Sequence, residues 1–321
     1  MISVVIPYFQ RERGILARAL QSVFASQDID QLEVIVVDDA SPIPALEEVE
    51  AIGSTRFPVR LIKQANNGPG GARNTGLDQV SPDAVYVAFL DSDDEWSPLH
   101  LKNAMTALRA GNDVYFSDHL QLGAETSAFC RANRIVAADH PSISVSDDLH
   151  SYEGDMFDQI ISGNVIGTST VVFDKRKFSD VRFRRDLKMA GEDYIFWLDL
   201  SLRGAKFAFG ASTEVVYGKG VNVFAGSGWG TEYHARRIID ELAFRRLLLA
   251  EYPLLDHHKN YVVAGIRSLH DAFVRDFLHR LNESKGIDWR LTFSALGQEP
   301  QIIFRVLPVV AMKLFGKERI I

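Results

Sequence analysis

The chain has very little cysteine and lacks several features that define common protein classes. Cys130 is the only cysteine among 321 residues, which excludes an internal disulfide and a zinc site built from cysteines. No apolar run is long enough to span a bilayer, and the first residues carry no basic leader, so we expect no membrane span and no signal peptide. The net charge of −7 disfavours nucleic acid as the main partner, because that binding depends on cations that neutralise phosphates.

Several short motifs of well-known enzymes are also missing. The segment Gly68-Pro69-Gly70-Gly71-Ala72-Arg73 has an arginine where a dinucleotide-binding fingerprint needs its third small residue. There is no Gly-Lys-Ser/Thr phosphate loop, no zinc-protease helix motif and no Gly-x-Ser-x-Gly elbow. The sequence therefore disfavours NAD binding, P-loop NTPase activity and two common classes of hydrolase.

The first half of the chain alternates short apolar strands with helices. The pattern predicts strands at the residue ranges 3–6, 32–37, 59–62, 85–90 and 114–117. It predicts helices that begin near residue 15, near Gly71 and at Ser97-Pro98, where a cap residue precedes a proline. Such alternation indicates an α/β fold with a largely parallel, doubly wound sheet, whose ligands bind at the carboxyl ends of the strands.

The second half is predicted to change character along its length. Residues 120–152 show no clear periodicity and are expected to form loops over the sheet, and 165–173 to form a strand. Gly191-Glu192-Asp193 introduces a predicted helix that runs to about Arg203, and a glycine-rich stretch follows from 218 to 230. The remaining chain is predicted to be helical, so we expect a catalytic domain at 1–230 and a helical C-terminal region at 231–321.

Three carboxylates crowd the end of the strand at 85–90, within the segment Asp91-Ser92-Asp93-Asp94. Packing alone does not favour such a cluster, because the charges repel each other and are costly to bury. A hard divalent cation such as Mg²⁺ or Mn²⁺ removes the repulsion and is commonly shared with substrate phosphates. The structural alternative is a turn whose side chains cap the following helix, which explains one aspartate but not three.

Five ordered blocks of the sequence resemble family 2 glycosyltransferases, which have the Rossmann-like GT-A fold. The blocks are Val4-Val5-Ile6-Pro7-Tyr8, Val36-Val37-Asp38-Asp39-Ala40-Ser41, Asn67-Gly68-Pro69-Gly70-Gly71-Ala72-Arg73-Asn74, Phe89-Leu90-Asp91-Ser92-Asp93-Asp94 and Gly191-Glu192-Asp193. The last third resembles bacterial exopolysaccharide glucosyltransferases of the succinoglycan type. The resemblance implies a mostly parallel sheet flanked by helices, with a helical C-terminal extension.

The resemblance also implies roles for individual residues. Asp193 matches the catalytic base, and Asp93 the direct metal ligand, with Asp91 beside it nearer the ribose. The residues that match or adjoin the UDP-sugar site are Pro7, Tyr8, Asp39, Arg73, Asp91, Ser92 and Glu192, to which the glycine-rich stretch adds Trp229 or Phe224 as a stacking surface for a sugar. Asp39 would bind the uracil and Arg73 the uracil or diphosphate. Structural alternatives are a turn for Asp39 and a helix start for Asp193.

The implied reaction is an inverting, metal-dependent transfer of a sugar, with glucose as the first candidate, from a UDP-sugar to a lipid-linked oligosaccharide acceptor. A nucleotidyltransferase and a non-catalytic sugar-nucleotide-binding protein are the alternatives. The apolar tail from Glu299 to Ile321 carries a local net charge of +2. It would suit peripheral contact with the cytoplasmic face of the inner membrane, core packing, or a homodimer contact.

Overall fold

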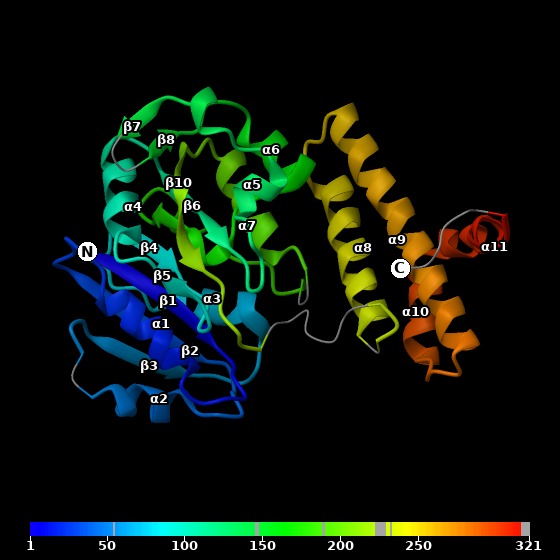
Figure 1. Cartoon of the computed structure of the whole chain (residues 1–321), viewed down its shortest axis with the longest axis horizontal. Helices are drawn as coiled ribbons and strands as arrows, with labels where there is room; N and C mark the ends of the chain where they lie inside the picture. Colours follow the sequence, from blue (N-terminus) through cyan, green and yellow to red (C-terminus); the bar gives the residue numbers. More distant parts are fainter. Residues whose placement is uncertain (54, 145–147, 188–189, 222–228, 232, 316–321) are drawn as a thin grey trace. The chain divides into compact units, whose positions relative to one another are not determined.

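The computed structural model describes the chain except residues 54, 145–147, 188–189, 222–228, 232 and 316–321, and except the side chains of 311–315. The chain divides into two compact units: Met1–Lys188 with Glu192–Asn222 form unit 1, and Met189–Gly191 with Val223–Ile321 form unit 2. The division at 222/223 precedes the predicted boundary at 230/231. Figure 1 shows the elements in chain order, from β1 and α1 in blue to α11 in red.

Unit 1 contains all the strands of the described residues, joined in one mixed sheet. The spatial order is β3-β2-β1-β4-β9-β6-β10-β8-β7, with β5 paired to β10. The strands are β1 (Ile2–Tyr8), β2 (Leu32–Asp38), β3 (Val59–Lys63), β4 (Tyr86–Phe89), β5 (Glu95–Trp96), β6 (Val114–Leu120), β7 (Ser142–Ser144), β8 (Leu149–Ser151), β9 (Val172–Asp174) and β10 (Phe207–Val216). From β3 to β4 the pairing is parallel, and β10 is parallel to β6; β9 runs antiparallel to both of its neighbours.

Helices cover both faces of this sheet, which is why every residue of β1 and β2 is buried. The helices of unit 1 are α1 (Ile15–Phe24), α2 (Ala45–Ile52), α3 (Gly68–Asp78), α4 (His100–Arg109), α5 (Ala128–Ala132), α6 (Met156–Gly163) and α7 (Glu192–Leu202), with 3-10 turns η1 (Ala137–Asp139) and η2 (Thr168–Thr170). Val4 and Ile6 of β1 belong to the core formed with α1 and α4. On the other face α3 lies so close to β1 that a Cβ at Gly76 would be 2.3 Å from a Val5 methyl carbon.

Four sequence expectations for unit 1 are wrong in detail. The segment 120–152 is not all loop, because β8 pairs antiparallel with β10; a three-residue strand is too short for its periodicity to reveal it. The predicted strand at 165–173 is reduced to β9, since η2 precedes it. Helix α4 begins at His100 rather than at Pro98, and α3 begins at Gly68 rather than near Gly71.

Unit 2 is helical, as predicted. It contains α8 (His234–Glu251), α9 (Asp256–Asn282), α10 (Trp289–Gln298), η3 (Pro300–Arg305) and α11 (Val306–Phe315). Arg246 and His270 both bind the Glu299 carboxylate, and Arg305 forms a two-pronged pair with Asp271, so charged contacts hold η3 on α8 and α9. None of the described helices combines the length and the apolar character that crossing a bilayer requires.

Candidate active site

The carboxyl end of β2 carries two aspartates whose oxygens bind backbone N–H groups. Asp38 accepts hydrogen bonds from the amides of Ser41 and Ala45, each at 2.9 Å, and so fixes the turn that leads into α2. Asp39 accepts from the amides of Asn67 at 2.8 Å and Gly68 at 2.9 Å. Asp39 therefore holds the start of α3 against the end of β2.

Asp39 also accepts a hydrogen bond from the Gln64 side-chain amide at 2.6 Å, on the oxygen that binds Asn67. Its other oxygen has the Gly68 amide as its partner, and a carboxylate oxygen accepts two bonds. The whole residue is 3% exposed. Contact between Asp39 and a uracil ring stays a prediction. The oxygen that binds the Gly68 amide is the one that can accept a further hydrogen bond.

Pro7 and Tyr8 end the neighbouring strand β1, opposite Val37 and Asp38 of β2. The Tyr8 carbonyl accepts the Asp39 amide at 3.0 Å, which joins the two strand ends. The Tyr8 side chain is buried, and burial, followed by the nearby Glu48 carboxylate, raises the pKa of its phenol to about 12. The predicted base-lining residues Pro7, Tyr8 and Asp39 thus lie together at one edge of the sheet.

Residues 91–94, which we call the acidic loop, follow β4 at the same edge. The Ser92 hydroxyl accepts a hydrogen bond from the Gln10 amide group at 3.0 Å. One oxygen of Asp94 accepts from the Ser169 hydroxyl at 2.5 Å and the other from the Gly218 amide at 3.0 Å. Asp94 is therefore part of the support of the loop and does not cap α4.

Asp93, like Asp91, is a partly buried carboxylate of the acidic loop. Burial, followed by the charge of Asp91, raises the pKa of Asp93 to about 6. The described start of the glycine-rich segment packs directly on this residue: a Cβ at Gly218 would be 1.5 Å from the Asp93 carbonyl oxygen, and one at Gly220 would be 2.5 Å from its carboxylate. Only glycine allows so close an approach.

The carboxylates of the acidic loop fit a divalent cation. Burial and the charges of Asp91 and Asp93 raise the pKa of Asp94 well above its usual value, so the loop is destabilised by its own negative charge. Oxygen-only donors on a turn are the set that Mg²⁺ and Mn²⁺ prefer. Asp91 and Asp93 are the better candidates for ligands, because both are partly exposed, whereas Asp94 is buried and each of its oxygens is held by a donor inside the protein.

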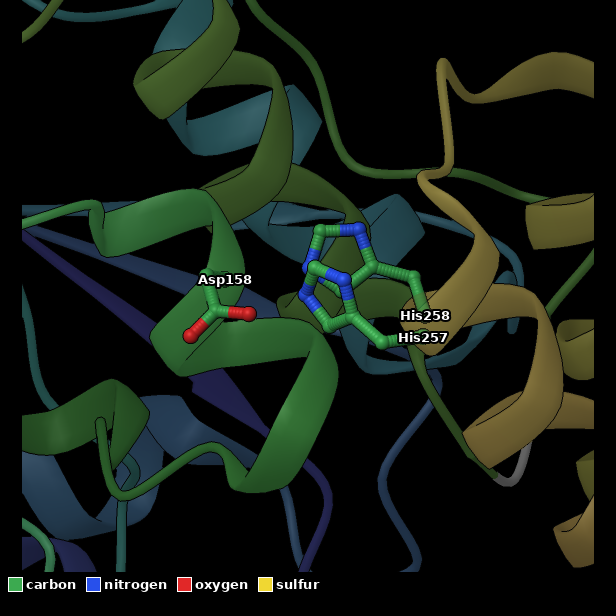
Figure 2. A group of neighbouring side chains, drawn as sticks. All are labelled: Asp158, His257 and His258. Carbon is green, nitrogen blue, oxygen red and sulfur yellow. The ribbon is translucent and has the colours of Figure 1, made fainter.

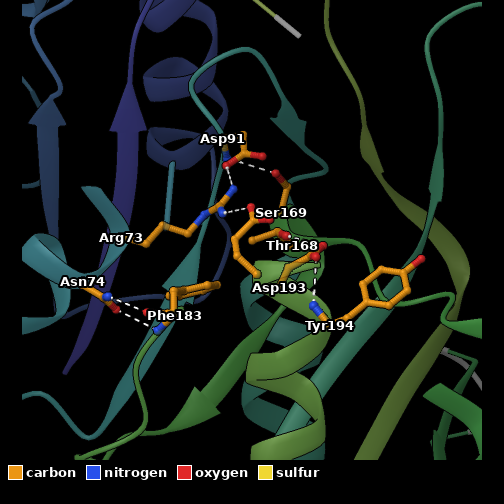
Figure 3. Close-up of polar contacts among 9 residues, drawn as sticks. Arg73, Asn74, Asp91, Thr168, Ser169, Phe183, Asp193 and Tyr194 are labelled. Atoms are coloured by element: carbon orange, nitrogen blue, oxygen red, sulfur yellow. Dashed lines mark hydrogen bonds and ion pairs between the residues drawn. The ribbon is translucent and has the colours of Figure 1, made fainter. Parts of the chain in front are cut away.

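Arg73 connects the acidic loop to the start of α7 (Figure 3). Its guanidinium donates to Asp91 at 2.7 Å and to Glu192 at 3.3 Å, and its side chain is only 5% exposed. The same guanidinium lies 5.3 Å from the centre of the Phe183 ring, and Asn74 pairs with the Phe183 backbone through two 2.8 Å bonds. Arg73 of helix α3 thus places one buried cation between the acidic loop and the carboxylates at the start of α7.

Glu192 and Asp193 occupy the first turn of α7. Burial and the charge of Asp193 raise the pKa of Glu192 to about 7, although Arg73 opposes the change. Burial raises the pKa of Asp193 as well, again opposed by Arg73. Asp193 accepts a hydrogen bond from the Thr168 hydroxyl at 3.4 Å and from the Tyr194 amide at 2.8 Å. A carboxylate with a raised pKa is a stronger base than an ordinary one.

The structure thus brings Asp91, Arg73, Glu192 and Asp193 into one group, next to Asp93. Trp229 is placed differently: it belongs to unit 2, where its ring centre lies 5.5 Å from that of His279. Its contact with a sugar stays a prediction, and Phe224 lies outside the described residues. Sequence reasoning missed Gln10, Gln64, Thr168 and Ser169, because single polar residues outside any motif carry no signal.

Two adjacent histidines at the start of α9 were also not anticipated. The rings of His257 and His258 lie with their centres 4.0 Å apart (Figure 2). His258 accepts a hydrogen bond from the Leu255 amide at 3.3 Å, which is the bond of a helix-capping side chain. Asp158, drawn in the same view, is in the first turn of α6 in unit 1. The capping bond gives His258 a structural role in unit 2.

Comparisons with known proteins agree with the predicted family. A family model described as glycosyl transferase family 2 matches residues 3–160. Succinoglycan biosynthesis protein ExoW of Rhizobium meliloti (strain 1021) is 37% identical over 225 residues, which are 70% of this chain and 70% of that protein.

Two solved structures have a similar fold. TarS 1-349 of S. aureus in complex with UDP-GlcNAc has a TM-score of 0.61 and 20% identity, over 98% of this chain and 84% of that one. The mannosyltransferase PcManGT of Pyrobaculum calidifontis, in complex with GDP-Man and Mn²⁺, has a TM-score of 0.59 and 15% identity, over 99% and 88%. At these sequence identities, the two structures show only that the fold is similar.

Proposed function

The chain belongs to glycosyl transferase family 2 and has the GT-A fold, and from this we propose that it moves a hexose from a UDP-sugar with inversion of the anomeric centre, using Asp193 as general base. The acceptor in this proposal is a lipid-linked oligosaccharide of bacterial exopolysaccharide synthesis, and glucose is the first donor sugar to test. The relative named as a succinoglycan biosynthesis protein supports a role in exopolysaccharide synthesis.

One observation carries the proposal: Arg73 binds Asp91 and Glu192 at once. This bridge joins the acidic loop to the helix turn that bears Asp193. Inverting transfer needs a base on one side of the anomeric carbon and charge-stabilising groups on the other. A group that holds both kinds of residue in a single hydrogen-bonded assembly suits this requirement.

In the proposed reaction Asp193 takes the proton of the acceptor hydroxyl while the oxygen of that hydroxyl attacks the anomeric carbon. The bond to the diphosphate breaks on the opposite side, so an α-linked donor gives a β-glycoside. The raised pKa of Asp193 supports this role, because proton transfer is most efficient when the pKa of the base lies closer to the working pH. Thr168 keeps one Asp193 oxygen oriented by its 3.4 Å hydrogen bond.

Asp91 and Asp93 would hold a Mn²⁺ or Mg²⁺ ion. When bound, such an ion neutralises the charge that develops on the departing diphosphate. The solved structure that contains Mn²⁺ has the same type of fold, which supports the assignment without fixing the metal. On the nucleotide side, Asp39 would accept from the uracil ring, Pro7 and Tyr8 would line it, and Asp91 would lie nearer the ribose, with Ser92 beside it.

A panel of UDP-sugars with Mn²⁺ or Mg²⁺ tests the proposal through release of UDP. We expect one sugar to be hydrolysed slowly without acceptor, and Asp193→Asn to bind UDP normally while turnover falls by about 10²–10⁴-fold. Wild-type turnover by Asp193→Asn would refute the base assignment. Diphosphate release from an NTP and a sugar phosphate would indicate a nucleotidyltransferase. Normal biological activity of the Asp193→Asn variant would indicate a non-catalytic sugar-nucleotide-binding protein.

We also propose that the protein works at the cytoplasmic face of the inner membrane, through apolar side chains of unit 2. Phe304 and Leu307 are 78% and 80% exposed, which is costly in water. The Phe304→Ser/Leu307→Ser variant should lose co-sedimentation with anionic vesicles, whereas Leu122→Ser, equally apolar and 61% exposed in unit 1, should not. Unchanged vesicle binding together with loss of a dimer in light scattering would assign this surface to a homodimer instead.

A further inference from the structure

The short turn η2 contains three consecutive hydroxyl residues that are almost completely buried. Thr168 is 7% exposed, and Ser169 and Thr170 are 0% exposed. Buried hydroxyls need hydrogen-bond partners, so the partners of each reveal what the turn holds together. The three side chains bind three different targets.

Ser169 binds the acidic loop at two points and Trp96 at a third. Its hydroxyl donates to the Asp94 carboxylate at 2.5 Å and accepts the Asp91 amide at 2.9 Å, while its carbonyl accepts the Trp96 indole N–H at 2.6 Å. These contacts span both ends of the loop and reach Trp96, the last residue of β5. Figure 3 shows Ser169 next to Asp91, with the hydrogen bond from the Asp91 amide to the Ser169 hydroxyl drawn as a dashed line. One side chain therefore fixes both the path of the loop and the direction of Asp94.

Thr168, the preceding residue, binds the other end of the site. Its hydroxyl donates to Asp193 at 3.4 Å, in the first turn of α7 (Figure 3). Thr170 differs from both, since its hydroxyl donates to the Gly167 carbonyl at 2.7 Å, within the same turn. Ser169 thus binds one half of the site, the acidic loop, and Thr168 binds the other half, Asp193. The Thr170 hydroxyl binds only within the turn itself.

We propose that Thr168 and Ser169 are positioning residues that set the spacing between the acidic loop and Asp193. The inference rests on the proposed function, in which the loop binds the metal and diphosphate and Asp193 is the base. Neighbouring residues of one tight turn cannot move far apart, so the turn acts as a fixed spacer. Displacement at a carbon needs the attacking and leaving groups in line, and a 1 Å error can cost about 10²-fold in rate.

The two residues should have separable effects when they are changed. Ser169→Ala should weaken Mn²⁺-dependent UDP binding by about tenfold, because Asp94 and the Asp91 amide lose their shared partner. Thr168→Val should leave UDP binding unchanged and lower kcat by about tenfold. It should also move the acidic limb of the pH–kcat profile to higher pH, since a hydrogen bond that favours the charged carboxylate is lost.

Thr170→Val is the matched control. It removes a buried hydroxyl bond from the same turn without touching either carboxylate, so its melting temperature should fall like that of Ser169→Ala. Its UDP binding and pH profile should stay as in the wild type. Ser169→Cys keeps nearly the same volume with a weaker donor, and it replaces Ser169→Ala if that variant does not fold.

Isothermal titration of UDP with Mn²⁺ and the pH dependence of kcat decide the proposal. Equal effects of all three substitutions on both measurements would overturn it, because they would reflect general loss of stability. Wild-type binding by Ser169→Ala and Ser169→Cys would also overturn it. If Asp193→Asn retains full turnover, the proposed function fails; if Asp193→Asn is inactive while Thr168→Val behaves as wild type, only the spacer fails.

Discussion

Two sets of carboxylates in unit 1 differ in how their charges are compensated. Asp38 and Asp39 follow β2 and accept hydrogen bonds from four backbone amides, those of Ser41, Ala45, Asn67 and Gly68. The acidic loop and the start of α7 instead place carboxylates near one another around the single cation of Arg73. There burial and mutual repulsion raise the pKa values of Asp93, Asp94 and Glu192.

The comparison separates two uses of the same residue type. Backbone N–H donors stabilise a carboxylate at all times, so the first set forms a rigid part of the fold. The second set also accepts hydrogen bonds, but its carboxylates are buried close to one another, and their repulsion destabilises the site until a proton or cation arrives. Sites that bind charged ligands commonly combine such groups, and the predictions below test the distinction.

The largest effect is expected from Asp93→Asn. The substitution removes one charge from the predicted metal site, so UDP binding in the presence of Mn²⁺ should weaken by about 100-fold. Binding without metal should change little, because Asp93 would act through the ion. Isothermal titration with and without Mn²⁺ measures both, and Asp83→Asn, an exposed aspartate away from the site, is the control. Unchanged metal dependence would remove Asp93 from the ligand set.

Asp39→Ala should mainly lower the stability of the fold, in contrast to Asp93→Asn. It leaves the Asn67 and Gly68 amides and the Gln64 side chain without their acceptor, and the free energy of unfolding should fall by about 2–3 kcal/mol. Asp93→Asn should not lower the free energy of unfolding of the metal-free protein, since it removes repulsion. Chemical denaturation of both variants compares the two sets directly. Equal destabilisation would show that they do not differ.

Gly218→Ala should weaken metal-dependent UDP binding by about tenfold, because a Cβ 1.5 Å from the Asp93 carbonyl oxygen must displace the acidic loop. Gly286→Ala is the matched control, as a Cβ there meets no atom within 4 Å. The Kd for UDP with Mn²⁺ should stay at the wild-type value in the control. A wild-type Kd for Gly218→Ala would mean that the loop tolerates the shift.

The smallest effect is a pH dependence of the stability of the metal-free protein. The folded pKa of Glu192, about 7, lies above the usual value of 4.5, so between these pH values the folded state binds more protons than the unfolded state. Stability should therefore fall as the pH rises from about 4.5 to 7, and Asp93, with a pKa of about 6, adds to the slope. Melting temperatures across this range measure it, and Glu192→Gln should reduce the slope. A melting temperature that rises with pH in the wild type would contradict the sign.

Much of unit 1 could be predicted from local pattern. The apolar residues of β1, β2 and α1 are continuous or follow a helical period, so their positions agree with the expected ranges. The three-residue strand β8 could not be predicted, because its pairing with β10 depends on residues about sixty positions away. The start of α4 was misplaced for a similar reason: Ser97 instead lies next to β10, where its amide binds the Glu214 carbonyl.

Residue type and order along the chain were sufficient to predict the family, the α/β alternation and the identity of the acidic residues. They could not predict which carboxylates are bound by amides and which repel each other, or that Arg73 binds Asp91 and Glu192 together; these contacts come from the fold. The fold also places Thr168 and Ser169 between the acidic loop and Asp193. Such contacts depend on distance in space, because a charge acts over a few ångströms, whatever the number of residues between its partners.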